Sequence, residues 1–285
     1  MSTSLLTALA LIGFAANSIF CRMALGESHL DPASFTSIRL LSGAIALYIL
    51  IQFKRPSATP IQSTLSSRTY APIMLFIYAS TFSFAYVNLN TGTGAIILYG
   101  AVHMTMMSVS IFAGNRPPFK AWLGMLIAFS GFVYLMLPSA SMPSLQGFFL
   151  MTIAGIAWGI YSMLGQTSHA PLWHTQHNFL YALPFTIALS FWFIDQNHLS
   201  NKGVLLAIVS GALASGIGYA LWYTVLKKIP TSLAASLQLL VPFIATVGGF
   251  LWLDEHISLH FSLAALMILS GIFIILKNKS TVVKR

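Results

Sequence analysis

Charge is the scarcest property of this chain. Only 7% of its 285 residues are charged, whereas 57% are hydrophobic. A soluble domain carries about 25% charged residues, so this chain has too little charge to cover a water-facing surface. Long uncharged runs indicate membrane spans of about 20 residues each, and ten such spans would use roughly 200 residues. The remainder suffices only for short loops, which excludes a separate soluble catalytic domain.

Cysteine and acidic residues are also scarce. Cysteine occurs once, at Cys21, which excludes an intrachain disulfide and predicts a small packed side chain in the first apolar run. The five acidic residues all fall outside the middle of the apolar runs, so we expect no intramembrane carboxylate site for protons or sodium. No basic residue precedes Arg22, so the first apolar run is expected to be an uncleaved helix rather than a secretory signal.

Apolar periodicity and chain breakers divide the sequence into ten expected helices. Proline and small polar residues mark most of the joints between them. We expect spans at roughly 4–25, 33–53, 71–89, 92–113, 119–137, 147–166, 175–193, 204–226, 232–253 and 258–276.

The charged residues segregate between the two sets of loops that these spans define. One set, together with Lys277 and a basic tail at 278–285, carries eleven of the fourteen basic residues and no acid. The other set carries all five acids, which are Glu27, Asp31, Asp195, Asp254 and Glu255. The positive-inside rule places the basic side and both termini in the cytoplasm. The net charge of +9 is therefore a topology signal, and we expect no nucleic-acid partner.

The five spans in 1–138 are echoed by the five in 147–277, about 140 residues later. The corresponding positions include Gly13-Phe-Ala-Ala-Asn17 with Gly155-Ile-Ala-Trp-Gly159, and Ser130-Gly131 with Ser270-Gly271. Because each set contains an odd number of crossings, the second copy must be inverted. The predicted fold is an all-α integral membrane protein of ten transmembrane helices in two inverted five-helix repeats. Transporters with this plan bind substrate near the bilayer midplane, at the repeat interface.

Several segments resemble a known family. They are Pro32-Ala-Ser-Phe-Thr-Ser-Ile-Arg39, Tyr219-Ala-Leu-Trp-Tyr-Thr-Val-Leu-Lys-Lys-Ile-Pro230, Leu237-Gln-Leu-Leu-Val-Pro242 and Phe250-Leu-Trp-Leu-Asp-Glu255. They are similar to EamA-type proteins of the drug/metabolite transporter superfamily. The resemblance implies ten helices, a central cavity and movement of small metabolites, often outward. Val102 and Val241 stand where the family often has Pro and Glu, so the resemblance does not carry a substrate with it.

Polar and aromatic residues in the middle of the spans are the candidate site. Such side chains are costly in lipid and usually face the bundle interior. Aromatic rings suit apolar or cationic parts of a substrate, whereas amide, hydroxyl and imidazole groups fix its orientation. Alternatively, each of these residues packs in the core or bonds across helices. The expected substrate-binding residues are Asn17, Arg39, Tyr99, His103, Trp158, Tyr161, Tyr219 and Gln238.

Two members of this set have alternative roles that involve charge. Arg39 either binds a substrate carboxylate bidentately or reaches outward to Asp31 or Glu27. His103 either serves a proton-coupled step, since an imidazole titrates near pH 6.5, or bonds to a neighbouring helix. We expect no cofactor and no metal site.

The sequence predicts a secondary transporter in the bacterial inner membrane. It would move an amino acid, an amphiphilic metabolite or a drug, outward, by alternating access around a midplane cavity. The alternatives are a membrane-embedded enzyme and a receptor or scaffold protein. An enzyme is not expected because the chain has no G-x-S-x-G or H-E-x-x-H motif and no acid within the membrane. The expected partners are a small molecule and the lipid bilayer, and the sequence leaves a homodimer open.

Overall fold

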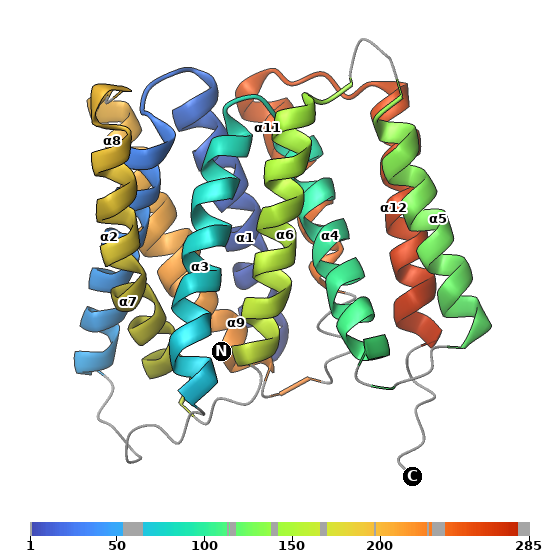
Figure 1. The fold of residues 1–285 in the computed structure, drawn as a ribbon, viewed down its shortest axis with the longest axis horizontal. Coiled ribbons are helices and arrows are strands. Elements are labelled where there is room, and N and C mark those ends of the chain that lie inside the picture. Colours follow the sequence, from blue (N-terminus) through green and yellow to red (C-terminus); the bar gives the residue numbers. More distant parts are fainter. Residues whose placement is uncertain are drawn as a thin grey trace.

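The computed structural model describes residues 2–53, 65–112, 114, 118–137, 142–165, 170–196, 198–226, 228–229 and 237–278. These residues form an all-helical bundle (Figure 1). In chain order its helices are α1 (Thr3–Gly26), α2 (Pro32–Phe53), α3 (Leu65–Tyr86), α4 (Thr91–Phe112), α5 (Phe119–Leu135), α6 (Leu145–Gly165), α7 (Pro171–Trp192), η1 (Ile194–Gln196), α8 (Asn201–Val209), η2 (Ser210–Ile217), α9 (Gly218–Leu226), α11 (Leu240–Leu253) and α12 (Leu259–Asn278).

The helix boundaries agree with the spans expected from the sequence to within a few residues at most positions. Two findings differ from that expectation. The span predicted at 204–226 is α-helical at both ends but π-helical in its middle, at η2. The span predicted at 232–253 contains the regular helix α11 only from Leu240, with Pro242 in its first turn, and residues 230–236 lie outside the described part. Except for Asn278, the predicted basic tail also lies outside it.

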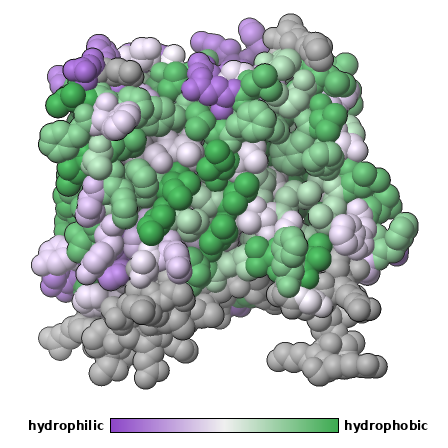
Figure 2. Space-filling view, viewed as in Figure 1, coloured by the Kyte–Doolittle hydropathy of each residue, from purple (hydrophilic) through white to green (hydrophobic). Residues whose placement is uncertain are grey.

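The outer surface of the bundle is apolar over a broad belt (Figure 2). Large hydrophobic side chains such as Tyr48, Leu126, Phe149 and Leu205 are more than half exposed. Among the described residues, five helical segments are long and apolar enough to cross a membrane, and α5, α11 and α12 are shorter apolar helices. A belt of exposed apolar side chains on helices that satisfy their own backbone hydrogen bonds is what a hydrocarbon environment requires. The protein is therefore a helical membrane protein.

The helices are arranged so that the first and second halves of the chain make matching contacts. Helices α5 and α12 pack together at one edge, and α2 and α7 pack together at the opposite edge (Figure 1). Between these edges, α6 packs on α3 and α4. Helix α1 packs in the same way on the α8–η2–α9 span and on α11. Each of these contacts has a counterpart when every helix of one half is replaced by the corresponding helix of the other half.

The α5–α12 edge is held by small residues that bring the two backbones close together. A Cβ atom added to Gly271 would lie 2.5 Å from both the Gly124 carbonyl oxygen and the Ala128 nitrogen. One added to Gly124 would lie 2.6 Å from the Gly271 carbonyl oxygen. Close backbone approach through small residues is a common basis of helix association in membranes, where water cannot drive apolar helices together.

One end of the bundle, which we call the acidic end, carries Glu27, Asp31, Asp195, Asp254 and Glu255 (top of Figure 1). The α1–α2 and α7–α8 loops meet there through a bridge between Leu30 and Leu199. Glu27 contacts Lys202 Nζ at 2.9 Å and His29 Nε2 at 2.6 Å. Hydrogen bonds from Lys202 and His29 hold the pKa of Glu27 below its usual value.

Four helices that begin at the acidic end are capped by a residue directly before them. In each case a side-chain oxygen accepts a hydrogen bond from an N–H of the first turn, which would otherwise have no helical partner. The capping residues are Asp31 for α2, Ser144 for α6, Ser200 for α8 and Ser258 for α12. Helix α4 also begins at this end, but its cap comes from a distant part of the chain, as described below.

Gly271→Ala is expected to destabilise the fold, because the added methyl group meets backbone atoms that cannot rotate away. We expect a loss of about 1–3 kcal/mol, the usual cost of overpacking, measured as a lower midpoint of thermal unfolding in detergent by tryptophan fluorescence. The neighbouring Ser270→Ala is the control, since Ser270 is exposed and its hydroxyl bonds only to its own helix. Equal unfolding midpoints for both variants would contradict this account of the α5–α12 contact.

Candidate functional site

A small cavity lies inside the bundle, where helices of both halves meet. Its volume of about 10 Å³ is enough for roughly one water molecule. The lining comes from α1, α3, α4, α6 and α9. The lining residues are Phe14, Asn17, Ser18, Tyr78, Phe82, Leu98, Tyr99, Trp158 and Tyr219.

Aromatic rings form most of the cavity wall. Trp158 is the central ring, with its centroid 4.8 Å from that of Tyr78 and 4.9 Å from that of Tyr219. Phe14 meets Trp158 and Tyr219 edge-on, with centroids at 6.3 and 5.8 Å. Edge-to-face and offset contacts at these distances are favourable for aromatic pairs. The wall can therefore enclose an apolar or aromatic group from several sides.

A polar network begins at the cavity wall and continues behind it. The Asn17 amide Nδ2 donates to the Tyr78 hydroxyl at 3.4 Å, and Asn17 Oδ1 accepts a 2.6 Å hydrogen bond from Ser210. Arg39 Nη2 also donates to the Tyr78 hydroxyl, at 3.2 Å, while its Nε donates to Ser215 at 3.2 Å. These residues join α1, α2, α3 and η2 in the interior of the bundle.

The π-helical stretch η2 gives this network its geometry. Five residues of an α-helix turn through about 500°, which would leave Ser210 and Ser215 about 140° apart around the axis. The wider turn of a π-helix bonds residue i to i+5 and brings such residues to nearly the same face. Gly211 lets this stretch approach α2 closely, because a Cβ there would collide with the Arg39 carbonyl oxygen. Both serine hydroxyls can thus serve one buried network.

Arg39 is the most unusual member of the network, since its side chain is completely buried. Its guanidinium carbon lies 5.0 Å from the ring centroid of Phe82 and 5.2 Å from that of Tyr78. Both distances are within the range of cation–π attraction. Its Nη1 has no hydrogen-bond partner among the described residues. Neither Asp31 nor Glu27 is among its contacts, because both acids bond to groups at the acidic end.

The structure places the sequence-predicted residues in three groups. Asn17, Tyr99, Trp158 and Tyr219 line the cavity, and Arg39 lies behind Tyr78. Tyr161 stacks near Trp158, with centroids 5.4 Å apart, and its hydroxyl accepts a hydrogen bond from Asn178 at 3.4 Å. His103 and Gln238 do not line the cavity.

His103 is buried, and its Nδ1 lies 2.7 Å from the Tyr99 carbonyl oxygen, one turn earlier in α4. Gln238 precedes α11 and is only partly buried.

Sequence reasoning missed several residues of the site. Tyr78 and Phe82 on α3 lie in an apolar run with nothing to mark them, and Ser210 and Ser215 resemble ordinary small residues of a membrane helix. Their spacing provides one retrospective signal. Tyr78 and Phe82 are four residues apart, as are Phe14 and Ser18, which places each pair on one helix face.

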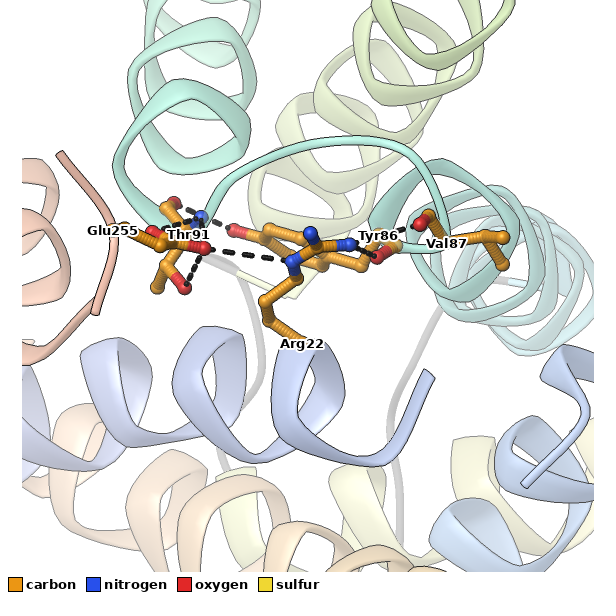
Figure 3. A network of polar contacts seen from close by, with 5 residues as sticks. All are labelled: Arg22, Tyr86, Val87, Thr91 and Glu255. Carbon is orange, nitrogen blue, oxygen red and sulfur yellow. Dashed lines mark hydrogen bonds and ion pairs between the residues drawn. The ribbon is translucent and has the colours of Figure 1, made fainter. Parts of the chain in front are cut away.

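A second polar network lies at the acidic end and joins the two halves of the chain (Figure 3). The Glu255 carboxylate accepts hydrogen bonds from the Thr91 backbone N–H at 2.8 and 2.9 Å and from the Thr91 hydroxyl at 3.1 Å. Glu255 is therefore the cap of α4, supplied by the α11–α12 loop, and its negative charge faces the positive end of the helix dipole. Asp254, in the left-handed conformation at φ 51°, ends α11 so that Glu255 can turn back.

Arg22 extends this network to α1 and α3. Its Nε lies 3.4 Å from Glu255 Oε1, and its Nη1 donates to the carbonyl oxygens of Tyr86 at 3.0 Å and Val87 at 2.8 Å (Figure 3). The ion pair is mostly buried, with side-chain exposures of 20% and 11%. We call Arg22, Thr91 and Glu255, together with the Tyr86 and Val87 carbonyls, the latch.

The latch lies one helical turn from the cavity. Arg22 follows the cavity-lining Ser18 by four residues on α1, and Tyr86 follows the cavity-lining Phe82 by four residues on α3. Positions four apart are neighbours along one face of a helix. The rings of Phe82 and Tyr86 contact each other, with centroids 4.7 Å apart. The latch therefore lies between the cavity and the outer surface of the acidic end.

Known proteins match this chain along nearly its whole length. A family model described as the EamA-like transporter family matches residues 1–137 and 145–277. An uncharacterized protein of Pseudomonas aeruginosa is 43% identical over 96% of this chain and 94% of its own length. A protein of Escherichia coli named a probable amino-acid metabolite efflux pump is 24% identical over 70% of this chain and 73% of its own.

The chain has the same fold as a solved crystal structure. That structure superposes with a TM-score of 0.62 at 16% sequence identity and covers 95% of this chain and 99% of its own chain. The two matched segments of the family model correspond to the two halves that pack together in this structure. The chain belongs to the EamA-like transporter family.

Proposed function

We propose that this protein is a secondary transporter built from two inverted five-helix repeats, with ten membrane crossings and both termini in the cytoplasm. It exports a small metabolite, namely an amino acid, an amphiphilic metabolite or a drug, from the cytoplasm of a bacterium across the inner membrane. The observation that carries this proposal is the central cavity, whose aromatic and polar wall is built from both halves of the chain. A substrate there would contact each half.

The size of the cavity supports alternating access. A space of about 10 Å³ holds water but no metabolite, so substrate entry requires the two halves to separate. The matching contacts of the halves allow them to rock about the edges where α2 meets α7 and α5 meets α12. Rocking of one repeat against the other around a fixed site is the usual motion of transporters with inverted repeats.

The latch supports an assignment of the closed side. Its charged groups connect α1, α3 and α4 of the first half to the α11–α12 loop of the second half, above the cavity. Opening toward the acidic end must break these contacts, whereas opening toward the other end leaves them intact. The positive-inside rule places the acidic end outside the cell. The structure then corresponds to a state closed to the exterior.

The relative named as an efflux pump supports outward transport of a metabolite. Identity to it is only 24%, and the chemistry of this site is a better guide to the substrate. The aromatic wall favours a substrate with an apolar or aromatic part. A sugar phosphate is disfavoured, because several cationic side chains would be needed to hold it and Arg39 is the only one in the network.

Trp158→Ala is expected to abolish transport, because this ring contacts three other aromatic residues of the wall. The assay is counterflow in proteoliposomes of a compound found by thermal-shift screening of the purified protein. Trp158→Phe, which keeps an aromatic ring and guards against misfolding, should retain part of the activity. Trp192→Ala is the matched control, since Trp192 is 84% exposed at the end of α7. Unchanged counterflow in Trp158→Ala would contradict a substrate site at this cavity.

Glu255→Gln is expected to open the exterior side more often, because it removes the ion pair with Arg22 and the charge that caps α4. Hydrogen bonds to charged groups contribute about 1.5–3 kcal/mol, so the open population should rise at least about tenfold. The measurement is the rate at which a membrane-impermeant thiol reagent labels Ser18→Cys from outside. Cys21→Ala removes the natural thiol, which is fully buried.

Lys202→Gln is the control for this experiment. It breaks the ion pair between Lys202 and Glu27 at the same end, but that pair is about half exposed, and such pairs contribute little. Labelling should therefore keep its original rate. An equal increase in both variants, or no increase in Glu255→Gln, would show that the latch does not control access.

A further inference from the structure

The positive charge of Arg39 has no negative charge beside it. All five acidic residues of the chain lie at the acidic end, where Glu255 meets Arg22, Glu27 meets Lys202, and Asp31 caps α2. The ionisable side chains near the guanidinium are Tyr78, Tyr219 and Cys21, which are ordinarily neutral at physiological pH. A buried charge that is not balanced is costly, and an anionic ligand would remove that cost.

Unused hydrogen-bond donors accompany the unbalanced charge. Arg39 Nη1 and the Tyr219 hydroxyl are both buried and lack a hydrogen-bond partner among the described residues. Tyr219 lines the cavity. Buried polar groups are nearly always satisfied, so such exceptions call for an explanation. A ligand that accepts hydrogen bonds would provide one.

The Tyr78 hydroxyl marks a point where donors converge. Its oxygen accepts from Arg39 Nη2 at 3.2 Å and from Asn17 Nδ2 at 3.4 Å. A carboxylate oxygen in place of this hydroxyl can accept the hydrogen bonds from Arg39 Nη2 and Asn17 Nδ2. The bond from Arg39 would then be stronger, because both partners are charged. Its second oxygen can then take the unused Nη1, since guanidinium and carboxylate pair through two parallel bonds. The Tyr78 ring covers Arg39 from the cavity side, so it must move aside when the ligand binds.

We propose that Arg39 is the anchor for a monoanionic organic carboxylate whose apolar body lies between Trp158, Tyr219 and Phe14. This proposal rests on the proposed transport function and specifies its substrate class. The carboxylate would displace the Tyr78 hydroxyl from Arg39 and Asn17, and the aromatic wall would hold the rest of the molecule.

Charge balance selects a single negative charge. One guanidinium neutralises one carboxylate, whereas a phosphate dianion would leave a buried net charge of the opposite sign. An organic cation would place a second positive charge beside Arg39, and no acidic side chain is there to balance either of the two charges. An α-amino group is not required, because the buried side-chain acceptors without a partner among the described residues are the neutral oxygens of Asn178 and Tyr219, and neither would balance an ammonium charge. The carboxylate is therefore the group that determines recognition.

Four probes that share a phenyl ring and a short chain test this assignment. They are hydrocinnamate, which is an anion; phenylalanine, a zwitterion; phenethylamine, a cation; and phenylpropanol, which is neutral. The first measurement is the shift in thermal unfolding of the purified full-length protein with each probe. We expect stabilisation by hydrocinnamate, equal or weaker stabilisation by phenylalanine, and none by phenethylamine or phenylpropanol. Equal stabilisation by the alcohol, or no stabilisation by hydrocinnamate, would overturn the proposal.

Variants of the anchor separate recognition from folding. Arg39→Gln should weaken hydrocinnamate binding by at least about tenfold, the loss expected for a charged pair. Tyr219→Phe removes a hydroxyl that lies near the Tyr78 hydroxyl without a well-formed hydrogen bond, so the unfolding midpoint without ligand should change little, while hydrocinnamate binding weakens. Ser270→Ala is the matched control, because Ser270 is exposed on α12 and does not line the cavity, and this variant should bind hydrocinnamate as well as the parent. Undiminished hydrocinnamate binding in both Arg39→Gln and Tyr219→Phe would assign Arg39 a purely structural role.

Counterflow of the same probes in proteoliposomes distinguishes this proposal from the proposed transport function. Hydrocinnamate binding that depends on Arg39, without counterflow of any probe, would support the anchor and contradict transport of this class. Counterflow of phenethylamine or phenylpropanol that survives Arg39→Gln would support transport and overturn the anchor.

Discussion

A fixed positive charge inside a bundle that faces lipid is the constraint around which the centre of this structure is organised. The Arg39 side chain is inaccessible to solvent, and lipid offers it no hydrogen bonds. Three kinds of neighbour stabilise it: the ring faces of Tyr78 and Phe82, the Tyr78 hydroxyl, and the Ser215 hydroxyl. These neighbours come from α3 and η2, so the charge determines how α2, α3 and the α8–η2–α9 span must fit together.

The π-helical stretch is a departure from regular α-helix that this arrangement requires. A regular α-helix would turn Ser210 and Ser215 to different faces, and only one of them could reach the network. π-helical turns are rare and are frequently found at functional sites. The stretch contains two glycines and two alanines among its eight residues, and Gly211 in particular allows its backbone to touch that of α2. Small side chains that look like simple packing residues thus also determine the geometry of the polar centre.

The helices and much of the site could be predicted from the sequence, because each depends on local pattern. The helices could be located from the long uncharged runs. Asn17, Tyr99, Trp158 and Tyr219 could be selected because polar groups are costly in lipid, and the four residues line one cavity. Tyr78 could not be selected, since a tyrosine in an apolar run is more often a packing residue. The ion pair between Arg22 and Glu255 could not be predicted either, because sequence spacing does not connect two residues in opposite halves. His103 satisfied the same criteria as the cavity residues, yet it lies outside the lining.

The α5–α12 edge has a consequence for how the protein is made. Among the described residues, the Gly124 face of α5 packs on α12, the last helix of the other half, and α5 has few contacts with α4. During synthesis α5 is made long before α12, and for that interval its small-residue face is uncovered. The first half therefore cannot complete its packing alone, and the bundle is closed at this edge only when the last helix has been made.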